Sequence, residues 1–151
     1  MHTTSIIPQI EDIIENCVRD KRDVVDADEH DIGIRQLLNL GHTAAHSIEI
    51  LSNFEISHGS AVAMGMAIIL RAAVKLGHCT KAECDEAIAL ISSYGLPVEC
   101  PYSARELADI ARCDKKRQGG SITLIMPFGI GDSRLYKVSV DSLEEIFKAG
   151  L

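Results

Sequence analysis

Two histidines four residues apart are the clearest candidates for chemistry in this 151-residue chain. The spacing of His42 and His46 places both side chains on one face of a helix. Histidine titrates near neutrality, and its neutral ring nitrogen binds zinc. The pair can therefore ligate a metal, or one ring can ligate while the other moves protons. Two ordinary histidines on a helix face remain the alternative interpretation.

Other polar residues extend this pattern. Arg35, Asn39, His42 and His46 line up at i, i+4, i+7 and i+11 within a segment whose other face is apolar. Polar groups that face a core cost free energy unless they are partnered, so the stripe predicts a pocket lining. A face turned to solvent is the alternative. His58 stands at the start of the next expected helix, and an antiparallel helix pair would bring it back against His42.

A second candidate site is the charged, glycine-rich segment 114–120, DKKRQGG. Lys115 and Lys116 are suitable phosphate ligands, because each supplies a point charge beside accessible backbone amides. A solvated charged turn is the alternative interpretation.

The elements that must position these residues are mostly helices. Apolar spacing predicts helices over 8–20, 34–51, 61–76, 81–94, from 103, and over 141–148, with 23–31 as a loop or frayed helix end. The expected N-terminal capping residues are Ser60, Thr80, Ser103 with Glu106, and Asp141. Gly41 falls in the middle of the second helix, where glycine costs about 1 kcal/mol relative to alanine and permits close approach of backbone or substrate.

Strands are expected only near the C-terminus. The β-branched, apolar run 122–125 predicts a strand over 121–126, and a glycine-rich turn over 127–132 separates it from a second strand over 135–140. We therefore predict a mainly α protein: one multi-helical domain over 1–151 with a small β ribbon near the C-terminus.

Composition excludes several classes of partner. The net charge is −7 and the longest basic stretch is 115–117, which argues against nucleic acid. The apolar segment 61–76 contains Arg71 and Lys75 and is shorter than the roughly 20 residues that span a bilayer. Five cysteines without a CxxC pair, and an acidic N-terminus without the pattern of a signal peptide, predict a cytoplasmic protein with reduced thiols.

Together these segments resemble the C-terminal domain of 3-dehydroquinate synthase, an enzyme of the shikimate pathway. The segment 35–46, RQLLNLGHTAAH, is similar to the family motif R-x-x-L-N-x-G-H-T-x-x-H, and 58–66, HGSAVAMGM, is similar to H-G-E-A-V-A-x-G-M. Lys21, followed by the acidic pair 28–29 and the segment 33–35, matches the approach to the first motif, and segments 114–120 and 127–131 match the C-terminal signature. The resemblance covers the chain from about residue 5 to its end.

The resemblance implies a helical domain that packs against an N-terminal NAD-binding domain, with a catalytic zinc (or cobalt) in the cleft between them. It implies the following roles: His42 and His58 as metal ligands, His46 near the substrate phosphate and in proton transfer, Lys21 and Arg35 on the substrate carboxylate, and Asn39 with Lys115 or Lys116 on the phosphate. The family's third metal ligand is a glutamate from a region ahead of this chain. No glycine-rich βαβ unit for NAD is present in the sequence.

The implied reaction converts 3-deoxy-D-arabino-heptulosonate 7-phosphate, a phosphorylated sugar acid, to 3-dehydroquinate and phosphate. The isolated chain is expected to be inactive and to associate as a homodimer. Ser60 stands where the family motif has glutamate, which removes a carboxylate beside a metal ligand. Two alternatives stay open: another sugar-phosphate cyclase, such as a 2-deoxy-scyllo-inosose synthase, and a non-catalytic helical oligomerisation domain.

Overall fold

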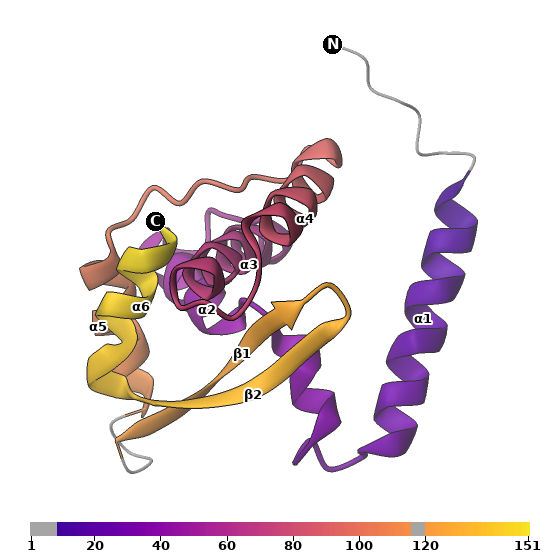
Figure 1. Cartoon of the computed structure of the whole chain (residues 1–151), viewed down its shortest axis with the longest axis horizontal. Coiled ribbons are helices and arrows are strands. Elements are labelled where there is room, and N and C mark those ends of the chain that lie inside the picture. The colour runs from indigo at the N-terminus through magenta and orange to yellow at the C-terminus, as the bar shows by residue number, and fades with distance from the viewer. Residues whose placement is uncertain (1–8, 116–119) are drawn as a thin grey trace. The chain divides into compact units, whose positions relative to one another are not determined.

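The computed structural model describes the backbone of residues 9–115 and 120–151 (Figure 1). Contacts divide the chain into two compact units, Met1–Leu38 and Asn39–Leu151.

The first unit is built on α1 (Ile10–Ala27), an 18-residue helix with no buried residue. The helix continues through 23–27, so the expected loop begins only at Asp28. The Asp28 carboxylate accepts hydrogen bonds from the backbone amides of Ile32, Gly33 and Arg35 at 3.1, 2.7 and 3.1 Å. Desolvation raises the pKa of this carboxyl, but the three amides together with the charge of Arg35 outweigh it and lower the pKa overall. Asp28 thus shapes the turn that leads into the 3₁₀ helix η2 (Ile34–Asn39).

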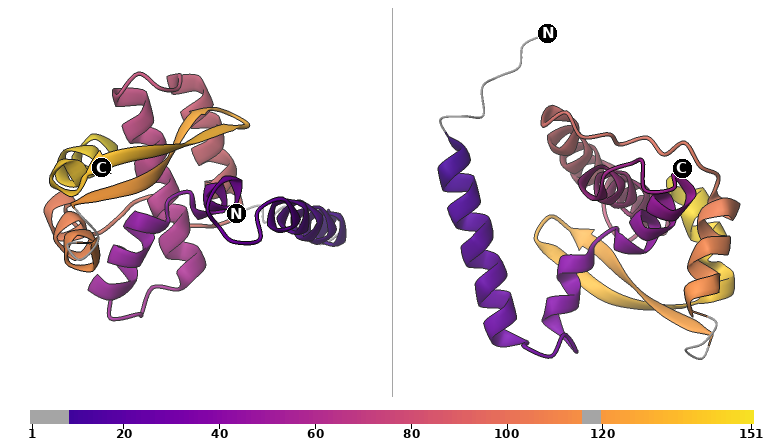
Figure 2. Two further views of the ribbon diagram at one scale, coloured as in Figure 1. Left: turned by 90° about the horizontal axis from the view of Figure 1, so that it is seen from below. Right: turned by 180° about the vertical axis from the view of Figure 1, so that it is seen from behind.

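Helices make up most of the second unit. They are α2 (His42–Leu51), α3 (His58–Lys75), α4 (Lys81–Ser93), α5 (Ala104–Lys115), the 3₁₀ helix η4 (Val140–Ser142) and α6 (Leu143–Gly150). The 18-residue α3 is central: it contacts α2, α4 and α6 and buries ten of its residues (Figures 1 and 2). Its many alanines and glycine leave room for these neighbours to approach closely.

An antiparallel hairpin completes the second unit. Strand β1 (Ser121–Gly129) pairs with β2 (Asp132–Ser139), with Leu124 opposite Tyr136. Most apolar side chains of β1 are buried and the strand packs against α3, whereas β2 has no buried residue. The predicted class, mainly α with a small β ribbon near the C-terminus, is confirmed.

The core lies in the second unit, between α3 and the elements around it. Its largest fully buried side chains include Phe147, Ile48, Ile68, Leu107 and Leu124. The buried Ser47 makes a polar contact within this core. Ser47 Oγ of α2 donates a 2.9 Å hydrogen bond to the carbonyl oxygen of Leu107 in α5, and so joins the two helices.

The predicted N-terminal capping residues are confirmed at two helices. Thr80 and Glu83 form a full capping box at α4, and Ser103 exchanges the same hydrogen bonds with Glu106 at α5. Two predicted caps were wrong. Ser57, not Ser60, caps α3, and the side chain of Ser139, not Asp141, caps η4 ahead of the last helix. The helix α3 begins three residues before the expected start at 61, and the 3₁₀ turn η4 begins one residue before the expected start at 141.

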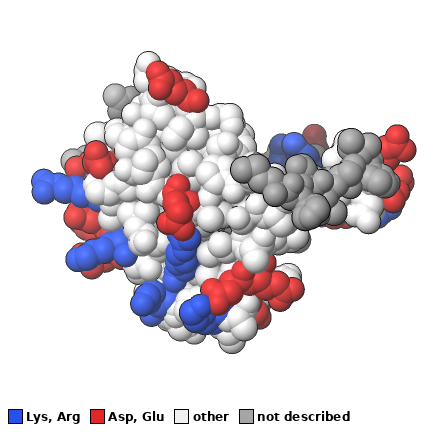
Figure 3. Space-filling model, turned by 90° about the horizontal axis from the view of Figure 1, so that it is seen from above, with Lys and Arg blue, Asp and Glu red and all other residues white. Residues whose placement is uncertain are grey.

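The distribution of charged side chains on the surface is mixed, as expected for a chain without a long basic stretch. On the face drawn in Figure 3, Lys and Arg side chains are interspersed with Asp and Glu and do not form one continuous basic patch. No helix among the described residues combines the length and apolar character needed to cross a membrane. The five cysteines are free thiols.

Candidate metal and substrate site

The site is organised by a close crossing of backbones between α2 and α3. Gly41 precedes α2 with φ +78°, a left-handed conformation that favours glycine, and its carbonyl oxygen accepts the first hydrogen bond of α2 from Ala45. A methyl group at Gly65 of α3 would overlap that same carbonyl oxygen, and one at Gly41 would overlap the backbone of Gly65 and Met66. Two glycines therefore let the start of α2 lie directly on α3.

Gly41 also corrects a sequence prediction. The expected continuous helix over 34–51 is broken there: η2 ends at Asn39 and α2 begins at His42. Arg35 and Asn39 consequently do not share a helix face with His42 and His46. The glycine is a helix boundary rather than a mid-helix residue, and this removes the propensity cost expected of it.

The crossing brings three imidazoles together. The ring centroid of His42 lies 5.4 Å from that of His58 and 6.1 Å from that of His46, in both cases edge to face. The expectation that the start of α3 returns to His42 is confirmed. His42 is half-buried, whereas His46 and His58 are exposed.

Hydrogen bonds orient two of these rings. His42 Nδ1 lies 3.2 Å from the carbonyl oxygen of Leu40, and His58 Nδ1 lies 3.0 Å from Glu49 Oε1. A carbonyl oxygen and an ionised carboxylate can only accept, so each Nδ1 must carry the proton and donate it. In the neutral rings the lone pair then sits on Nε2, the state in which histidine binds a metal.

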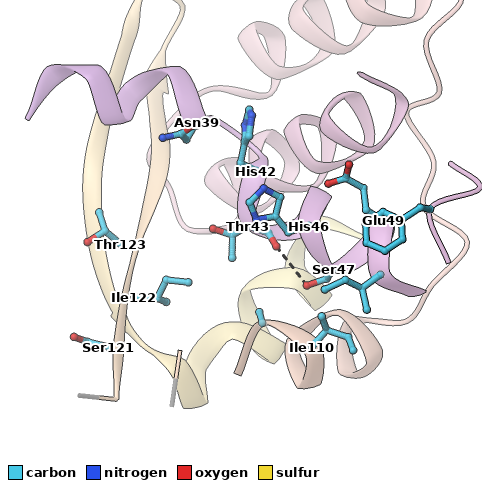
Figure 4. Close-up of a pocket in the computed structure, with 13 residues that line it drawn as sticks. Asn39, His42, Thr43, His46, Ser47, Glu49, Ile110, Ser121, Ile122 and Thr123 are labelled. Atoms are coloured by element: carbon cyan, nitrogen blue, oxygen red, sulfur yellow. Dashed lines mark hydrogen bonds between the residues drawn. The ribbon is translucent and has the colours of Figure 1, made fainter. Parts of the chain in front are cut away.

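A cavity of about 780 Å³ opens beside these rings (Figure 4). Its wall includes Asn39 and, from α2, His42, His46 and Glu49, while Ser121 and Thr123 of β1 lie on the opposite side. The remaining lining residues are Thr43, Ser47, Ile50, Phe54, Ile110, Ala111 and Ile122. Imidazole, amide and hydroxyl groups around a volume of this size suit a polar small molecule.

The structure brings together only part of the predicted site. Asn39, His42 and His46 share the cavity wall, and His58 adjoins His42. Lys21 and Arg35 belong to the first unit, where the Arg35 side chain donates a 3.0 Å hydrogen bond to the carbonyl oxygen of Glu29.

The predicted lysine pair falls at the edge of the described region. Lys115 is the last residue of α5, and its side chain is not described. Lys116 lies outside the described residues.

Glu49 is a candidate site residue that the sequence prediction did not include. It follows His42 and His46 at i+7 and i+3, on the same face of α2, so the spacing that selected the histidines also selects Glu49. Its contact with His58 depends on how α2 meets α3. Ser121 and Thr123 were missed because only the hairpin's docking brings them to the cavity.

The donor set fits a zinc or cobalt ion in part. Two imidazoles with free Nε2 atoms are suitable ligands for either metal. Within 9–115 and 120–151, no group of three or more His, Cys, Asp or Glu side chains is arranged to hold a metal. A third ligand would therefore come from water or from outside the described residues.

The family described as 3-dehydroquinate synthase C-terminal matches residues 3–117. The chain belongs to this family. Curated relatives include the 3-dehydroquinate synthases of Thermococcus kodakarensis, 37% identical over 139 residues, and of a Synechococcus strain, 38% identical over 141 residues. These alignments cover 92% and 91% of this chain but 40% and 38% of the relatives. This member of the 3-dehydroquinate synthase C-terminal family thus spans about two-fifths of the length of the curated relatives it matches.

Solved structures share the fold of this 3-dehydroquinate synthase C-terminal domain. A 2-deoxy-scyllo-inosose synthase in complex with carbaglucose-6-phosphate, NAD⁺ and Co²⁺ superposes with a TM-score of 0.81 at 22% identity, over 95% of this chain and 42% of that one. A 2-epi-5-epi-valiolone synthase from Streptomyces hygroscopicus with NAD⁺ and Zn²⁺ bound gives 0.75 at 24% identity, over 90% and 38%. At these identities the likeness concerns the fold.

Proposed function

We propose that this chain acts as the metal- and substrate-binding C-terminal half of a 3-dehydroquinate synthase. The observation that carries the proposal is the packing of His42 against His58, with both Nδ1 atoms positioned as donors, beside a cavity that Asn39 and His46 also line. The proposal is also supported by the match to the family and by relatives that are named 3-dehydroquinate synthase.

In this proposal His42 and His58 hold zinc or cobalt. The bound ion would act as a Lewis acid that polarises hydroxyl and carbonyl oxygens of the substrate. His46 projects from α2 one turn beyond His42 and lines the same cavity, so it can take or return a proton at the substrate. The amide of Asn39 supplies hydrogen bonds on the phosphate side.

The substrate is the phosphorylated sugar acid 3-deoxy-D-arabino-heptulosonate 7-phosphate, and the products are 3-dehydroquinate and phosphate. Lys21 and Arg35 would hold its carboxylate, and Lys115 or Lys116 its phosphate, because cations neutralise and orient anionic groups. NAD and the third metal ligand would come from an N-terminal NAD-binding domain. We expect the assembled enzyme to be a homodimer.

Calorimetric titration of zinc into this chain, beside its His42→Ala variant, tests the metal site. Saturable one-to-one binding to the wild-type chain that is lost in the variant would support the proposal. His78→Ala is the matched control, because His78 stacks on Phe128 of the hairpin, away from the three clustered imidazoles. Equal zinc binding by the His42→Ala variant would contradict the role of His42.

Activity needs a second experiment. The N-terminal half of a related 3-dehydroquinate synthase, mixed with this chain, NAD and zinc, should release phosphate from the heptulosonate substrate. The chain alone should release none. Release by the chain alone would overturn the two-part arrangement.

The competing function is that of another sugar-phosphate cyclase, whose substrate lacks the carboxylate. The presence of both Lys21 and Arg35 favours the shikimate substrate. In the reconstituted pair, Arg35→Ala should raise the KM for the heptulosonate strongly. An unchanged KM would favour the alternative substrate class.

A further inference from the structure

We propose that Glu49 is a positioning residue for His58: its carboxylate holds the His58 proton on Nδ1 and so presents Nε2 to a divalent cation. The inference rests on the proposed metal-binding role of His42 and His58 and adds to it a residue of this chain. It starts from the 3.0 Å contact between His58 Nδ1 and Glu49 Oε1, which links α2 to α3.

The different burial of Glu49 and His58 supports the view that the carboxylate orients the imidazole. The Glu49 side chain is only 16% exposed, whereas that of His58 is 59% exposed. Glu49 also lies in the last turn of α2, directly after the buried residues Ser47 and Ile48. The carboxylate is therefore the fixed partner, and the more exposed imidazole takes its orientation from it.

His42 has an equivalent acceptor of a different kind. Its Nδ1 lies 3.2 Å from the carbonyl oxygen of Leu40, which no side-chain substitution removes. Of the two expected metal ligands, only His58 has a ring set by a replaceable side chain. Among the described residues, the His46 ring has no corresponding acceptor, which agrees with a role in proton transfer rather than in ligation.

Such outer partners affect metal binding. A carboxylate or carbonyl acceptor fixes the tautomer and ring orientation of a ligating histidine and increases its basicity, and its loss lowers metal affinity by roughly 10- to 100-fold. The motif that begins with His58 has Ser60 at the position where the family motif has a glutamate. The Ser60 hydroxyl accepts from Ser57 Oγ within its own helix turn, which leaves Glu49 as the carboxylate bonded to His58.

The first test measures the His58 tautomer without metal. Two-dimensional ¹⁵N NMR of the imidazole rings at alkaline pH should show Nδ1–H for His58 in the wild-type chain. Glu49→Ala should give a mixture of tautomers, and Glu49→Gln should keep Nδ1–H, because an amide oxygen still accepts. Glu55→Ala, at an exposed position in the loop before α3, is the control. An unchanged His58 tautomer in Glu49→Ala would overturn the proposal.

The second test measures metal affinity. Calorimetry with zinc should show affinity about 10- to 100-fold weaker in Glu49→Ala, with a smaller loss in Glu49→Gln and none in Glu55→Ala. The Co²⁺ absorption spectrum should change in Glu49→Ala as the His58 ring reorients. A lower Tm with unchanged zinc affinity and Co²⁺ spectrum would show a merely structural tie and contradict the proposal.

The experiments distinguish a failure of the proposed metal site from a failure of the proposed role of Glu49. If the wild-type chain and His42→Ala both fail to bind zinc, the metal role of this chain by itself is wrong. The NMR comparison would still decide whether Glu49 sets the His58 tautomer.

Discussion

The molecule contains two helices of equal length, α1 and α3, each of 18 residues. Ten residues of α3 are buried, and none of α1 is. Both sequences carry apolar residues at helical spacing, but α1 also carries many charges, whereas α3 is built mainly from alanine and larger aliphatic residues with a glycine at the crossing. Equal length and clear periodicity therefore say little about how firmly a helix is held.

The difference bears on the candidate site. His58 begins α3, which packs against α2, α4, α6 and β1, so core contacts fix the helix that carries it. Lys21 lies in α1, where Ile14 and Val18 are 55% and 63% exposed. Residues proposed to act together thus depend on very different amounts of packing.

The same substitution in the two helices should give the largest contrast. Ile68→Ala removes a fully buried side chain from α3 and should destabilise the protein by about 2–5 kcal/mol through lost transfer free energy and a residual cavity. Ile14→Ala in α1 should change stability by no more than about 0.5 kcal/mol. Urea unfolding followed by circular dichroism measures both. Equal losses would show that α1 contributes to the core.

A glycine pair within α3 sharpens the comparison. Gly65→Ala places a methyl group on the Gly41 carbonyl oxygen and should cost about 1–3 kcal/mol through overpacking, while separating His42 from His58. Gly59→Ala is the control in the same helix, since a methyl group there meets nothing within 4 Å and should stabilise by up to about 1 kcal/mol. Unfolding midpoints and zinc affinity report both effects. A fully stable Gly65→Ala variant would refute the backbone crossing.

The cap of α4 should have a smaller effect. Thr80→Ala removes the acceptor for the Glu83 amide and should cost about 0.5–2 kcal/mol. Ser92→Ala, at an exposed site in the last turn of the same helix, should be close to neutral. Thermal unfolding provides the comparison, and no difference between the two variants would count against a stabilising capping box.

The smallest expected effect is on pH dependence. The Thr80 hydroxyl lowers the pKa of Glu83, and the Ser103 hydroxyl lowers the pKa of Glu106; in both cases the backbone amide of the same cap residue adds to the effect. A depressed pKa in the folded state stabilises the fold above the ordinary glutamate value of 4.5, and this contribution is lost as pH falls below it.

The double variant Glu83→Gln, Glu106→Gln should therefore lose less stability than the wild type between neutral pH and acid. Glu86→Gln, exposed on α4, serves as the control. Acid unfolding curves that stay parallel for wild type and double variant would contradict the link.

Local signals predicted much of the fold. The cap at Thr80, the capping box at α5, the end of α3 before Gly77 and the β ribbon all follow from short-range hydrogen bonding and side-chain periodicity, and the structure has each of them. The same reasoning extended one helix across Gly41 and ended another too early, at 20 instead of 27. From sequence alone, Gly41 can be read either as part of a helix or as a helix boundary. The acidic segment 23–27 can likewise be read either as a loop or as the end of a helix.

The site divides in the same way. By itself, the sequence determined which residues have suitable chemistry and that His42, His46 and Glu49 share one helical face, because a helix has a fixed period. Only the tertiary structure decided that His58 meets His42, that Glu49 contacts His58, and that Ser121 and Thr123 of β1 line the same cavity as the histidines. These contacts depend on how closely two backbones pass at Gly41 and Gly65, a property of packing between segments and not of either segment alone.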